Sequence, residues 1–545
     1  MFGLMCAAHV ANTDHVITDD FKLTATDGGA TDEFGTSVSV SGHIAIIGVP
    51  NDDDALPNAG AAYIFSFDGI EWIEEQKLFA SDPQEDDQFG YSVSIDGDTA
   101  VIGARNHNDN GDNSGSAYVF RFNGLEWDHE QKLLASDGHE QDQFGHAVSV
   151  EGDNILIGSR YAETQAVDAG ESTATGAAYI FSHDGNSWVE HTKLVPSDGE
   201  NDDRFGYSVA IDDNTALIGS HLNDANGTDA GAIYIYSFNN NEWTNEIKLM
   251  NGNSGDQFGY SVSLDDDTAV IGARLNDDNG TDAGSAYVYY FDAKKQQWLF
   301  ESQLLASEGE NHDQFGWSVA IDETTVIVGV YLDDDNGSAS GSSYMYRLED
   351  GTWAETTKFL ASDGDASDQF GWFVSIDGNV TVFGSRLDDD SGSNSGSAYI
   401  IDVGDDDDDG IFNGSDNCEL YNPNQYDYNS NGIGDTCEIA NGTIPDCNEN
   451  DIWDWWEIWV GWAEDCNGND VPDECDIDDT TSQDVNGNEI PDECEDDCNE
   501  NGIPDEWDLS EGTSEDCNEN SVPDECDISS GDSYDVNGNN TPDEC

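Results

Sequence analysis

Residues 87–104 read DQFGYSVSIDGDTAVIGA, and this stretch decides the fold because it recurs along the chain. Phe-Gly, with an Asp two residues before the Phe, returns seven times at intervals of 53 to 61 residues. The Phe residues are Phe34, Phe89, Phe144, Phe205, Phe258, Phe315 and Phe370, and the Asp residues are Asp32, Asp87, Asp142, Asp203, Asp256, Asp313 and Asp368. Self-similarity at such a period indicates a repeat architecture.

Each repeat contains four short runs in which apolar residues are frequent. In the second repeat they are YSVSI (91–95), TAVIGA (99–104), SAYVFRF (116–122) and EQKLLA (130–135). Short β-branched and aromatic runs bounded by Gly, Asn and Asp are typical of strands. Four strands in each of seven repeats predict a mainly β fold, a seven-bladed β-propeller over residues 21–403.

The strand count also predicts how the ring closes. The third run, which contains a Tyr, occurs seven times, but the fourth run follows a Trp only six times. The segment FKLTA (21–25), before the first Phe-Gly, matches the missing run. We expect it to form the outer strand of the seventh blade, so that no seam is left between the first and last blades.

The repeats resemble the FG-GAP repeats of integrin α-subunits and bacterial surface proteins. The second signature is an apolar-apolar-Gly element, seen in IIGVP (46–50), VIGAR (101–105), LIGSR (156–160), LIGSH (217–221), VIGAR (270–274), IVGVY (327–331) and VFGSR (382–386). The resemblance implies a propeller with one ligand-binding face. Strand direction brings the Asp before each Phe-Gly and the loops between the second and third strands to that face, where we expect an extracellular protein or glycan to bind.

Those loops, such as LNDANGTDAG (222–231), are acidic but lack a full metal pattern. They are interpreted as solvated loops, with weak cation binding as the alternative. The integrin calcium loop between the first two strands is replaced by short turns such as DGD (96–98), so we expect no ion there.

The charge of the chain excludes some functions. It has 117 acidic and 15 basic residues, a formal net charge of −102. Nucleic-acid binding is not expected, because phosphates require clustered Lys and Arg. Residues 387–545 contain 49 acidic residues and no Lys, Arg or His, so divalent cations are the simplest means of neutralising them. No apolar stretch reaches 18 residues, so no transmembrane helix is expected.

Residues 404–440 resemble thrombospondin type 3 repeats, in which carboxylates and amides alternate around calcium. Ligands at every second residue suit a hard ion that takes 6–8 oxygens. The matching ligands are Asp405, Asp407, Asp409, Asp416, Asp427, Asn429, Asn431 and Asp435.

Residues 441–545 contain six loops of the form D-x-N-x-N, with the ligand spacing of EF-hand loops and a likeness to dockerin repeats. Numbering each loop from its first Asp, position 1 is Asp446, Asp465, Asp484, Asp497, Asp516 and Asp535. Position 3 is Asn448, Asn467, Asn486, Asn499, Asn518 and Asn537, and position 5 is Asn450, Asn469, Asn488, Asn501, Asn520 and Asn539. Position 9 is Asp454, Asp473, Asp492, Asp505, Asp524 and Asp543, and position 12 is Glu457, Asp476, Glu495, Asp508 and Asp527.

Two departures from the EF-hand pattern predict a modest calcium affinity. Position 6, normally Gly, is Gly only at Gly502. Position 12 is Asp rather than the longer Glu in three loops, so it has a shorter reach to an ion.

Ten of the eleven cysteines lie in the tail, between Cys418 and Cys545, which predicts disulfides and an oxidising, extracellular compartment. A zinc site is disfavoured because the region has no His and no C-x-x-C. A regular spacing of 19 residues predicts the pairs Cys418–Cys437, Cys447–Cys466, Cys475–Cys494, Cys498–Cys517 and Cys526–Cys545.

Two segments stand outside this scheme. Residues 1–20 begin with an apolar stretch that has no basic residue before it, and they are interpreted as the possible remnant of a signal peptide. In 451–465, Trp455, Trp459 and Trp462 share one face of a predicted helix, which forms either a small local core or an exposed patch for a partner or carbohydrate.

The sequence therefore predicts an extracellular, calcium-binding adhesion or interaction protein without catalytic activity. We find no G-x-S-x-G, H-E-x-x-H, P-loop or dinucleotide fingerprint. The alternatives are a hydrolase or lyase that acts on polysaccharide through the propeller face, and a structural component of a surface layer. The sequence does not identify the ligand or the oligomeric state.

Overall fold

The computed structural model describes residues 13–17, 22–69, 71–165, 172–349, 351–404, 433–441, 443–447, 452–461, 463–478 and 480–543. The predictions for Asp405, Asp407, Asp409, Asp416, Asp427, Asn429, Asn431, Asn448, Asn450, Trp462, Cys418 and Cys545 lie outside this part of the chain. The molecule separates into two compact units, Met1–Val403 and Gly404–Cys545. Each unit is described by itself.

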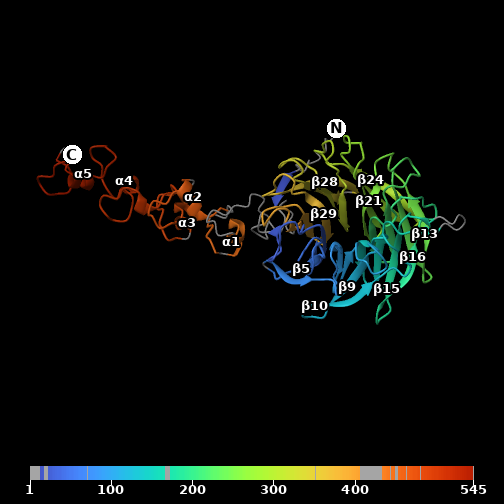
Figure 1. Cartoon of the computed structure of the whole chain (residues 1–545). Coiled ribbons are helices and arrows are strands. Elements are labelled where there is room, and N and C mark those ends of the chain that lie inside the picture. Colours follow the sequence, from blue (N-terminus) through green and yellow to red (C-terminus); the bar gives the residue numbers. More distant parts are fainter. Residues whose placement is uncertain are drawn as a thin grey trace, which may run out of the picture. The chain divides into compact units, whose positions relative to one another are not determined.

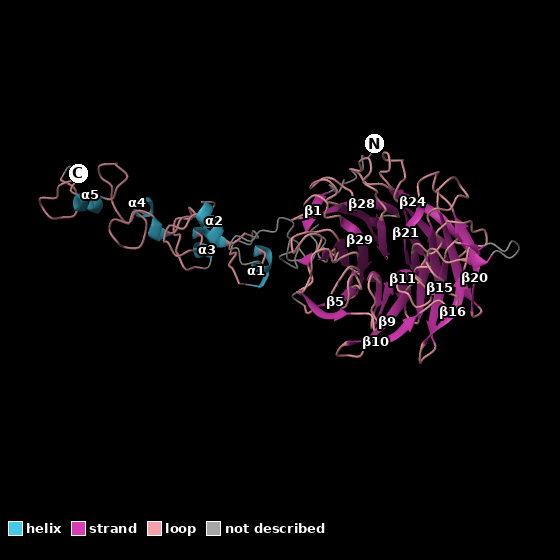
Figure 2. Cartoon of the chain, in the orientation of Figure 1, coloured by secondary structure: helices cyan, strands magenta, loops and turns pink. Residues whose placement is uncertain are grey.

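The first unit is a seven-bladed β-propeller, as the repeats predict (Figures 1 and 2). Blades one to three are β3 (Ser37–Ser41), β4 (Ile44–Val49), β5 (Ala61–Phe67) and β6 (Trp72–Leu78); β7 (Phe89–Asp96), β8 (Thr99–Ala104), β9 (Ser116–Phe122) and β10 (Trp127–Leu133); and β11 (Phe144–Glu151), β12 (Asn154–Ser159), β15 (Ala177–His183) and β16 (Trp188–Leu194). A small hairpin, β13 (Thr164–Gln165) and β14 (Ser172–Thr173), lies in the third repeat.

The remaining blades repeat this antiparallel order. They are β17 (Val209–Asp212), β18 (Thr215–Ser220), β19 (Ala232–Asn239) and β20 (Glu242–Leu249); β21 (Phe258–Asp265), β22 (Thr268–Ala273), β23 (Ser285–Asp292) and β24 (Gln297–Leu304); β25 (Ser318–Asp322), β26 (Thr325–Val330), β27 (Ser342–Glu349) and β28 (Thr352–Ala361); and β29 (Phe370–Asp377), β30 (Val380–Ser385), β31 (Ser397–Asp402) and β2 (Lys22–Leu23).

The ring closes with an N-terminal strand, which confirms the prediction made from FKLTA. Strand β2 pairs antiparallel with β31, with Lys22 opposite Tyr399 and Leu23 opposite Ala398. A further strand, β1 (Thr13–Ile17), pairs parallel with β28 at the outer edge of blade six. Part of the segment interpreted as a signal-peptide remnant therefore belongs to the propeller sheet.

The Phe-Gly motif joins each blade to its neighbour. The Phe backbone bridges to a Gly that precedes the third strand of the preceding blade, and Phe34 bridges to Gly396 to complete the circle. Gly396 has φ +79°, and a Cβ there would lie 2.1 Å from the carbonyl oxygen of Phe34. Only Gly fits such a close approach of two backbones, so this part of the repeat is fixed by sterics.

The hydrophobic core lies between adjacent blades. One cluster combines Ile46, Ile64 and Leu78 of blade one with Phe89 and Trp127 of blade two. In every blade the Phe of Phe-Gly is buried against the Tyr of the third strand, as in the edge-to-face pair of Phe89 and Tyr118 with ring centroids 5.4 Å apart. Because each core needs two blades, the ring is stable only when it is closed.

A lysine lies at the same place in six of the seven blades, directly opposite this buried Tyr. In blade one, Lys77 Nζ lies 3.0, 2.7 and 2.6 Å from carboxylate oxygens of Asp27, Asp52 and Asp54. Tyr63 donates a hydrogen bond of 2.6 Å to Asp27. Burial raises the pKa of Asp27, but the hydrogen bonds from Tyr63 and Lys77 outweigh this effect and hold its pKa below the ordinary value. The six residues are Lys22, Lys77, Lys132, Lys193, Lys248 and Lys358.

Blade five shows that the lysine and its carboxylates depend on one another. Gln303 replaces the lysine and donates to Asp278 at 2.8 Å. Residues 250–255, which lead to the Phe-Gly of blade five, contain no acidic residue, whereas the equivalent segment of every other blade contains at least one. In addition, Asn276 stands where blade one has Asp52. The ammonium group is therefore absent from the blade in which there is less charge for it to neutralise.

We predict that Lys77→Gln alone lowers the free energy of unfolding of the propeller by about 2 kcal/mol, because it leaves carboxylates unpaired. The triple variant Lys77→Gln, Asp27→Asn, Asp52→Asn, which copies blade five, should recover at least half of that loss. Thermal and urea unfolding at pH 7, followed by near-UV circular dichroism, measure both. Equal stability of the single and triple variants would contradict the charge-neutralisation role.

The innermost strand ends in a carboxylate in six blades, at the end opposite to Phe-Gly. These residues are Asp96, Glu151, Asp212, Asp265, Asp322 and Asp377. Several accept a backbone N–H from the turn of the next blade, as Asp96 does from Gly152 at 2.8 Å. Burial and the charges of Asp96 and Asp212 raise the pKa of Glu151 to about 7. Ionising Glu151 within this ring of carboxylates therefore costs free energy in the folded state.

We predict that Glu151→Gln stabilises the propeller more at pH 8 than at pH 5. The folded-state pKa of about 7 lies above the value of about 4.3 for an unfolded glutamate. The cost of ionising Glu151 is therefore fully present above pH 7 and declines as the pH falls toward the unfolded pKa. Thermal midpoints of wild type and variant at both pH values test this, with Glu126→Gln, an exposed carboxylate, as the control. An equal gain at both pH values would contradict it.

The second unit consists of short helices that follow the predicted loops. They are α1 (Asp435–Asn441), α2 (Asp454–Val460), α3 (Asp473–Asp478), the 3₁₀ turn η2 (Asp492–Cys494), α4 (Asp505–Glu511) and α5 (Asp524–Ser530). From α2 onward, each begins at loop position 9. No helix among the described residues is long and apolar enough to cross a membrane.

Candidate functional site

From the loop that begins at Asp465 onward, each tail loop folds around the carboxylate of its position-1 residue. In the third loop, Asp484 Oδ1 accepts N–H groups from Gly487 at 2.6 Å and Asn488 at 3.1 Å, and Oδ2 accepts from Glu489 at 3.0 Å. Backbone N–H groups of the loops beginning at Asp465, Asp497, Asp516 and Asp535 bond in the same way. Position 1 therefore lies over the turn, as a loop-type cation site requires.

The side chains at positions 3, 5 and 12 converge. Asn486 Nδ2 and Asn488 Nδ2 donate to the two oxygens of Glu495, each at 2.8 Å. The equivalent contacts reach Asp476, Asp508 and Asp527 in three more loops. A half-turn of an amide exchanges its oxygen and nitrogen, so the same side chains can direct oxygens at a cation between them.

Position 9 closes the loop and also retains a free oxygen. Asp492 Oδ1 accepts the N–H of Val485 at 2.9 Å, and Asp524 Oδ1 accepts that of Cys517 at 2.9 Å. The Oδ2 atoms of Asp492 and Asp524 are buried and have no hydrogen-bond partner in the part of the chain that the structure describes. A buried unpaired carboxylate oxygen is costly, and a hard cation is the ligand that removes this cost. Asp492 also lines an acidic cavity of about 430 Å³ together with Glu495 and Asp497.

The disulfides follow a different spacing from the predicted one. Cys447 pairs with Cys475, Cys466 with Cys494 and Cys498 with Cys526, each 28 residues apart. The predicted pairs Cys447–Cys466, Cys475–Cys494, Cys498–Cys517 and Cys526–Cys545 are wrong. Each bond instead joins position 2 of one loop to position 11 of the next. Cys437 and Cys517 are disulfide-bonded as well.

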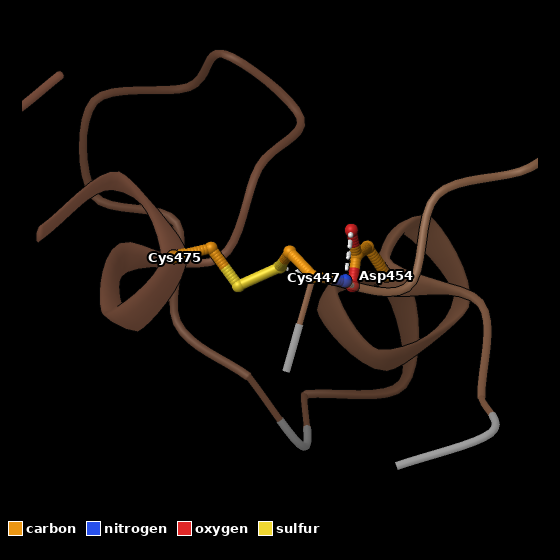
Figure 3. Close-up of side chains that lie close together, drawn as sticks. All are labelled: Cys447, Asp454 and Cys475. Carbon is orange, nitrogen blue, oxygen red and sulfur yellow. Dashed lines mark hydrogen bonds between the residues drawn. A yellow bond between two sulfur atoms is a disulfide. The ribbon is translucent and has the colours of Figure 1, made fainter. Parts of the chain in front are cut away.

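The physical reason for the 28-residue spacing lies in the position-9 aspartate. Its hydrogen bond to the N–H of position 2 holds that backbone against the first turn of the helix that follows. In the first loop, Cys447 N donates to Asp454 Oδ1 at 3.0 Å, and the sulfur of Cys447 then meets Cys475 on helix α3 of the next loop (Figure 3). Each disulfide therefore ties one loop to the helix of the next.

Among the described residues, five groups of three His, Cys or Asp side chains lie close enough to hold an ion. Three consist of a disulfide and the neighbouring position-9 Asp, so their sulfurs are not free thiolates. The other two are in the propeller and already contain a lysine. Lys132 binds Asp82 and Asp109, and Lys22 Nζ lies 2.5 to 2.8 Å from Asp363, Asp388 and Asp390. In these two clusters an ammonium group neutralises part of the charge of the acidic loop, a contact that the interpretation as solvated loops missed.

The Asp before each Phe-Gly is not part of an acidic surface. All seven are buried, with exposed fractions of 0 to 6%. Each accepts a backbone N–H from the residue three positions earlier, as Asp87 does from Gln84 at 2.6 Å. The expectation that these side chains contribute to the binding face is wrong, because the turn before the blade requires their carboxylates.

The tryptophans of helix α2 are partly exposed. Trp455 is 38% and Trp459 65% exposed, and their rings stack at 6.4 Å. Of the two interpretations made from the sequence, an exposed aromatic patch describes these two residues better than a closed local core.

The sequence analysis missed the residues around the propeller axis. The residue after Phe-Gly is aromatic in six blades, and Arg follows the second strand in four. Both regularities stand in the repeat alignment, and the Arg residues end the quoted elements VIGAR, LIGSR and VFGSR. The role of these aromatic residues and arginines becomes visible only in the closed propeller, which brings residues from separate repeats together at the axis.

The blade pattern and the residues that bridge the blades define a repeat-built propeller of the Phe-Gly class. The FG-GAP repeat family matches residues 17–65, 72–120, 127–181, 188–236, 243–289, 298–346 and 353–401. These matches cover more than half of the chain, which therefore belongs to the FG-GAP repeat family. Propellers of this family are generally non-enzymatic and have a fold of the extracellular interaction type. No curated protein matches the chain.

The position-6 residues are held in a left-handed conformation although most are not Gly. The φ angles are 66° at Asp470, 69° at Glu489, 68° at Ser521 and 58° at Asn540, compared with 81° at Gly502. A non-Gly residue there costs about 1–2 kcal/mol. This strain is the structural cost of the departure from the EF-hand pattern that the sequence shows.

We predict that Glu489→Gly stabilises the third loop by about 1 kcal/mol, whereas Glu489→Ala, which removes the same charge but keeps the strain, does not. Gly502→Ala should destabilise the fourth loop, and because no atom lies within 4 Å of the added Cβ, the effect isolates φ. Far-UV circular dichroism during heating, with and without calcium, measures these differences. Equal effects of the Gly and Ala variants at position 489 would contradict the strain argument.

Proposed function

We propose that this protein is an extracellular, calcium-binding interaction protein. Its propeller presents a binding face to a protein or glycan, and residues 404–545 form a stalk or attachment module that calcium stiffens. Disulfides in the tail support an extracellular location. The FG-GAP propeller supports the interaction role.

The observation that carries the proposal is the convergence of positions 3, 5 and 12 in four tail loops. Residues 387–545 have no basic side chain that can neutralise the 49 acids. The donors are all oxygen-bearing, as calcium prefers over zinc. The bound ion would supply positive charge at the centre of each loop, and the protein's own residues would position their oxygens around it.

The stiffening follows from where the disulfides and the loops meet. Position 9 begins a helix, bonds to position 2 of its own loop and lies beside the disulfide to the next loop. An ion held by positions 1 to 12 of one loop therefore fixes the helix to which the preceding loop is tied. Ordering would pass along the array through covalent bonds.

We predict that the full-length protein binds several calcium ions, and that Asp516→Ala and Glu495→Gln each lose one ion per chain. Native mass spectrometry and calorimetric titration count the ions. Chelation should reduce the far-UV helical signal of the tail and leave the near-UV signal of the propeller unchanged, because lysines already neutralise the described propeller clusters.

The matched control is Glu500→Gln, which removes one exposed charge at position 4, where the EF-hand spacing has no ligand. It should keep the wild-type number of ions. Absence of bound calcium in the wild type, or the loss of an ion in Glu500→Gln as well, would overturn the proposal.

A further inference from the structure

The axis of the propeller contains a cavity of about 160 Å³ that is lined by aromatic rings together with Thr, Ser, Ala and Val side chains of the innermost strands. Each blade contributes the residue that follows Phe-Gly. These residues are Thr36, Tyr91, His146, Tyr207, Tyr260, Trp317 and Trp372. We call the six rings among them the collar.

The rings of the collar contact one another in series around the axis. Neighbouring centroids are 5.3 Å apart for Tyr91 and His146, 4.9 Å for His146 and Tyr207, and 5.0 Å for Tyr207 and Tyr260. The series continues at 4.8 Å to Trp317 and 4.5 Å to Trp372. Thr36 interrupts the collar in blade one, so the rings form an open arc with a gap on one side.

Four arginines surround the collar, each immediately after the second strand of its blade. Arg105 lies 3.4 Å from the ring centre of Tyr91, and Arg386 lies 3.4 Å from that of Trp372. Arg274 contacts Tyr260 at 4.2 Å and Trp317 at 5.0 Å, and Arg160 lies 5.8 Å from Tyr207. The chain has only 15 basic residues, so this concentration of positive charge is a marked exception on an acidic protein.

A glutamine orients each arginine through its Nε atom, and the Nη1 atom of Arg274 also donates to Gln314 at 3.1 Å. The Nε atoms of Arg105, Arg160, Arg274 and Arg386 donate to the glutamine that precedes Phe-Gly in the same blade, at 2.8 to 2.9 Å. In the described chain, Arg386 has one carboxylate, Glu33, at 3.6 Å, and no described carboxylate lies within 4.0 Å of the other three. Such pre-oriented guanidinium groups are suited to carboxylate or sulfate.

Two histidines, one in the collar and one beside it, each carry a ring nitrogen that has no hydrogen-bond partner among the described residues. His146 belongs to the collar, and His221 lies 4.1 Å from the ring of Tyr207. Both are at least nine-tenths buried, with exposed fractions of 5% and 6%, and the Nδ1 atom of each has no hydrogen-bond partner. Burial and the nearby arginines lower the pKa of both well below the ordinary value, so both rings are neutral. A neutral imidazole can accept from or donate to a hydroxyl group.

We propose that the collar binds a six-membered sugar ring that carries a carboxylate or a sulfate group. The cavity is close in size to the cavity of about 150 Å³ that holds a benzene ring in an engineered protein. Aromatic walls with a few convergent polar groups are typical of small-ligand sites. The arginines do not line the cavity but lie against the collar rings, where they would meet an acidic group that extends from the sugar and would repel a cationic partner.

This inference rests on the proposed function in one respect, the use of the propeller as a binding platform, but it does not require calcium. The distinction matters for the experiment, because acidic oligosaccharides also bridge to carboxylates through calcium. Binding at the collar persists in chelator and depends on the arginines. Binding by the tail is lost in chelator and is independent of the arginines.

The test uses the full-length protein in about 150 mM salt, where charges beyond about 8 Å are screened. The probes are uronate and sulfated oligosaccharides, each paired with its methyl-esterified or desulfated counterpart, and calorimetry is run in chelator and in calcium. We expect an acidic probe to bind in chelator at least about tenfold more tightly than its neutral counterpart. The uronate and sulfate arms identify which anion is preferred.

The variant Arg105→Gln/Arg160→Gln should weaken this binding by at least about tenfold, and Arg274→Gln, in another blade, should weaken it independently. Arg121→Gln is the matched control, because Arg121 lies outside the collar and pairs with Asp98 and Glu130. Thermal midpoints establish that each variant is folded. The proposal is overturned if no acidic probe binds in chelator, if neutral probes bind as well, or if the collar variants bind like Arg121→Gln. Binding confined to calcium would assign the interaction to the tail.

Discussion

The distribution of 15 basic side chains among 117 acidic ones constrains the whole chain. Six lysines occupy one repeat position, and each lies opposite a buried Tyr and beside carboxylates of the blade's edge. Four arginines occupy another position, around the axis. Blade five, where the lysine is Gln303 and the preceding segment lacks acids, shows that these charges are matched locally rather than spread over the molecule. The propeller therefore uses its own lysine and arginine side chains as counter-charges to its carboxylates.

The tail meets the same constraint with no basic residue. Its carboxylates are arranged in loops where amides at positions 3 and 5 contact the acid at position 12, and where a position-9 oxygen is left without a partner at Asp492 and Asp524. A lysine neutralises one or two carboxylates at a time, whereas a calcium ion gathers 6–8 oxygens. In the proposed function, external cations enter this array, and its order would then depend on the medium in a way that the order of the propeller does not.

The sequence predicted what is repeated locally and missed what depends on closure. Strand alternation, turn residues and the match of FKLTA to the fourth run were sufficient for the blades and for the pairing of β2 with β31. The disulfides were mispredicted because the cysteines recur at both 19-residue and 28-residue spacings: the shorter spacing joins equivalent loop positions, whereas the bonds in the structure join position 2 of one loop to position 11 of the next. The collar was missed because the residue after Phe-Gly acquires its neighbours only when seven repeats form a ring.

The side chains nearest the propeller axis differ in charge between the two ends of the innermost strands. Innermost strands begin beside the collar, with Arg105, Arg160, Arg274 and Arg386, and end at a ring of six carboxylates that includes Glu151. An anion approaching the carboxylate end meets like charge, and burial together with the neighbouring carboxylates raises the pKa of Glu151 to about 7. At the collar it meets guanidinium groups that glutamines already hold in place. For the acidic sugar proposed above, this distribution of charge would favour approach from the collar end.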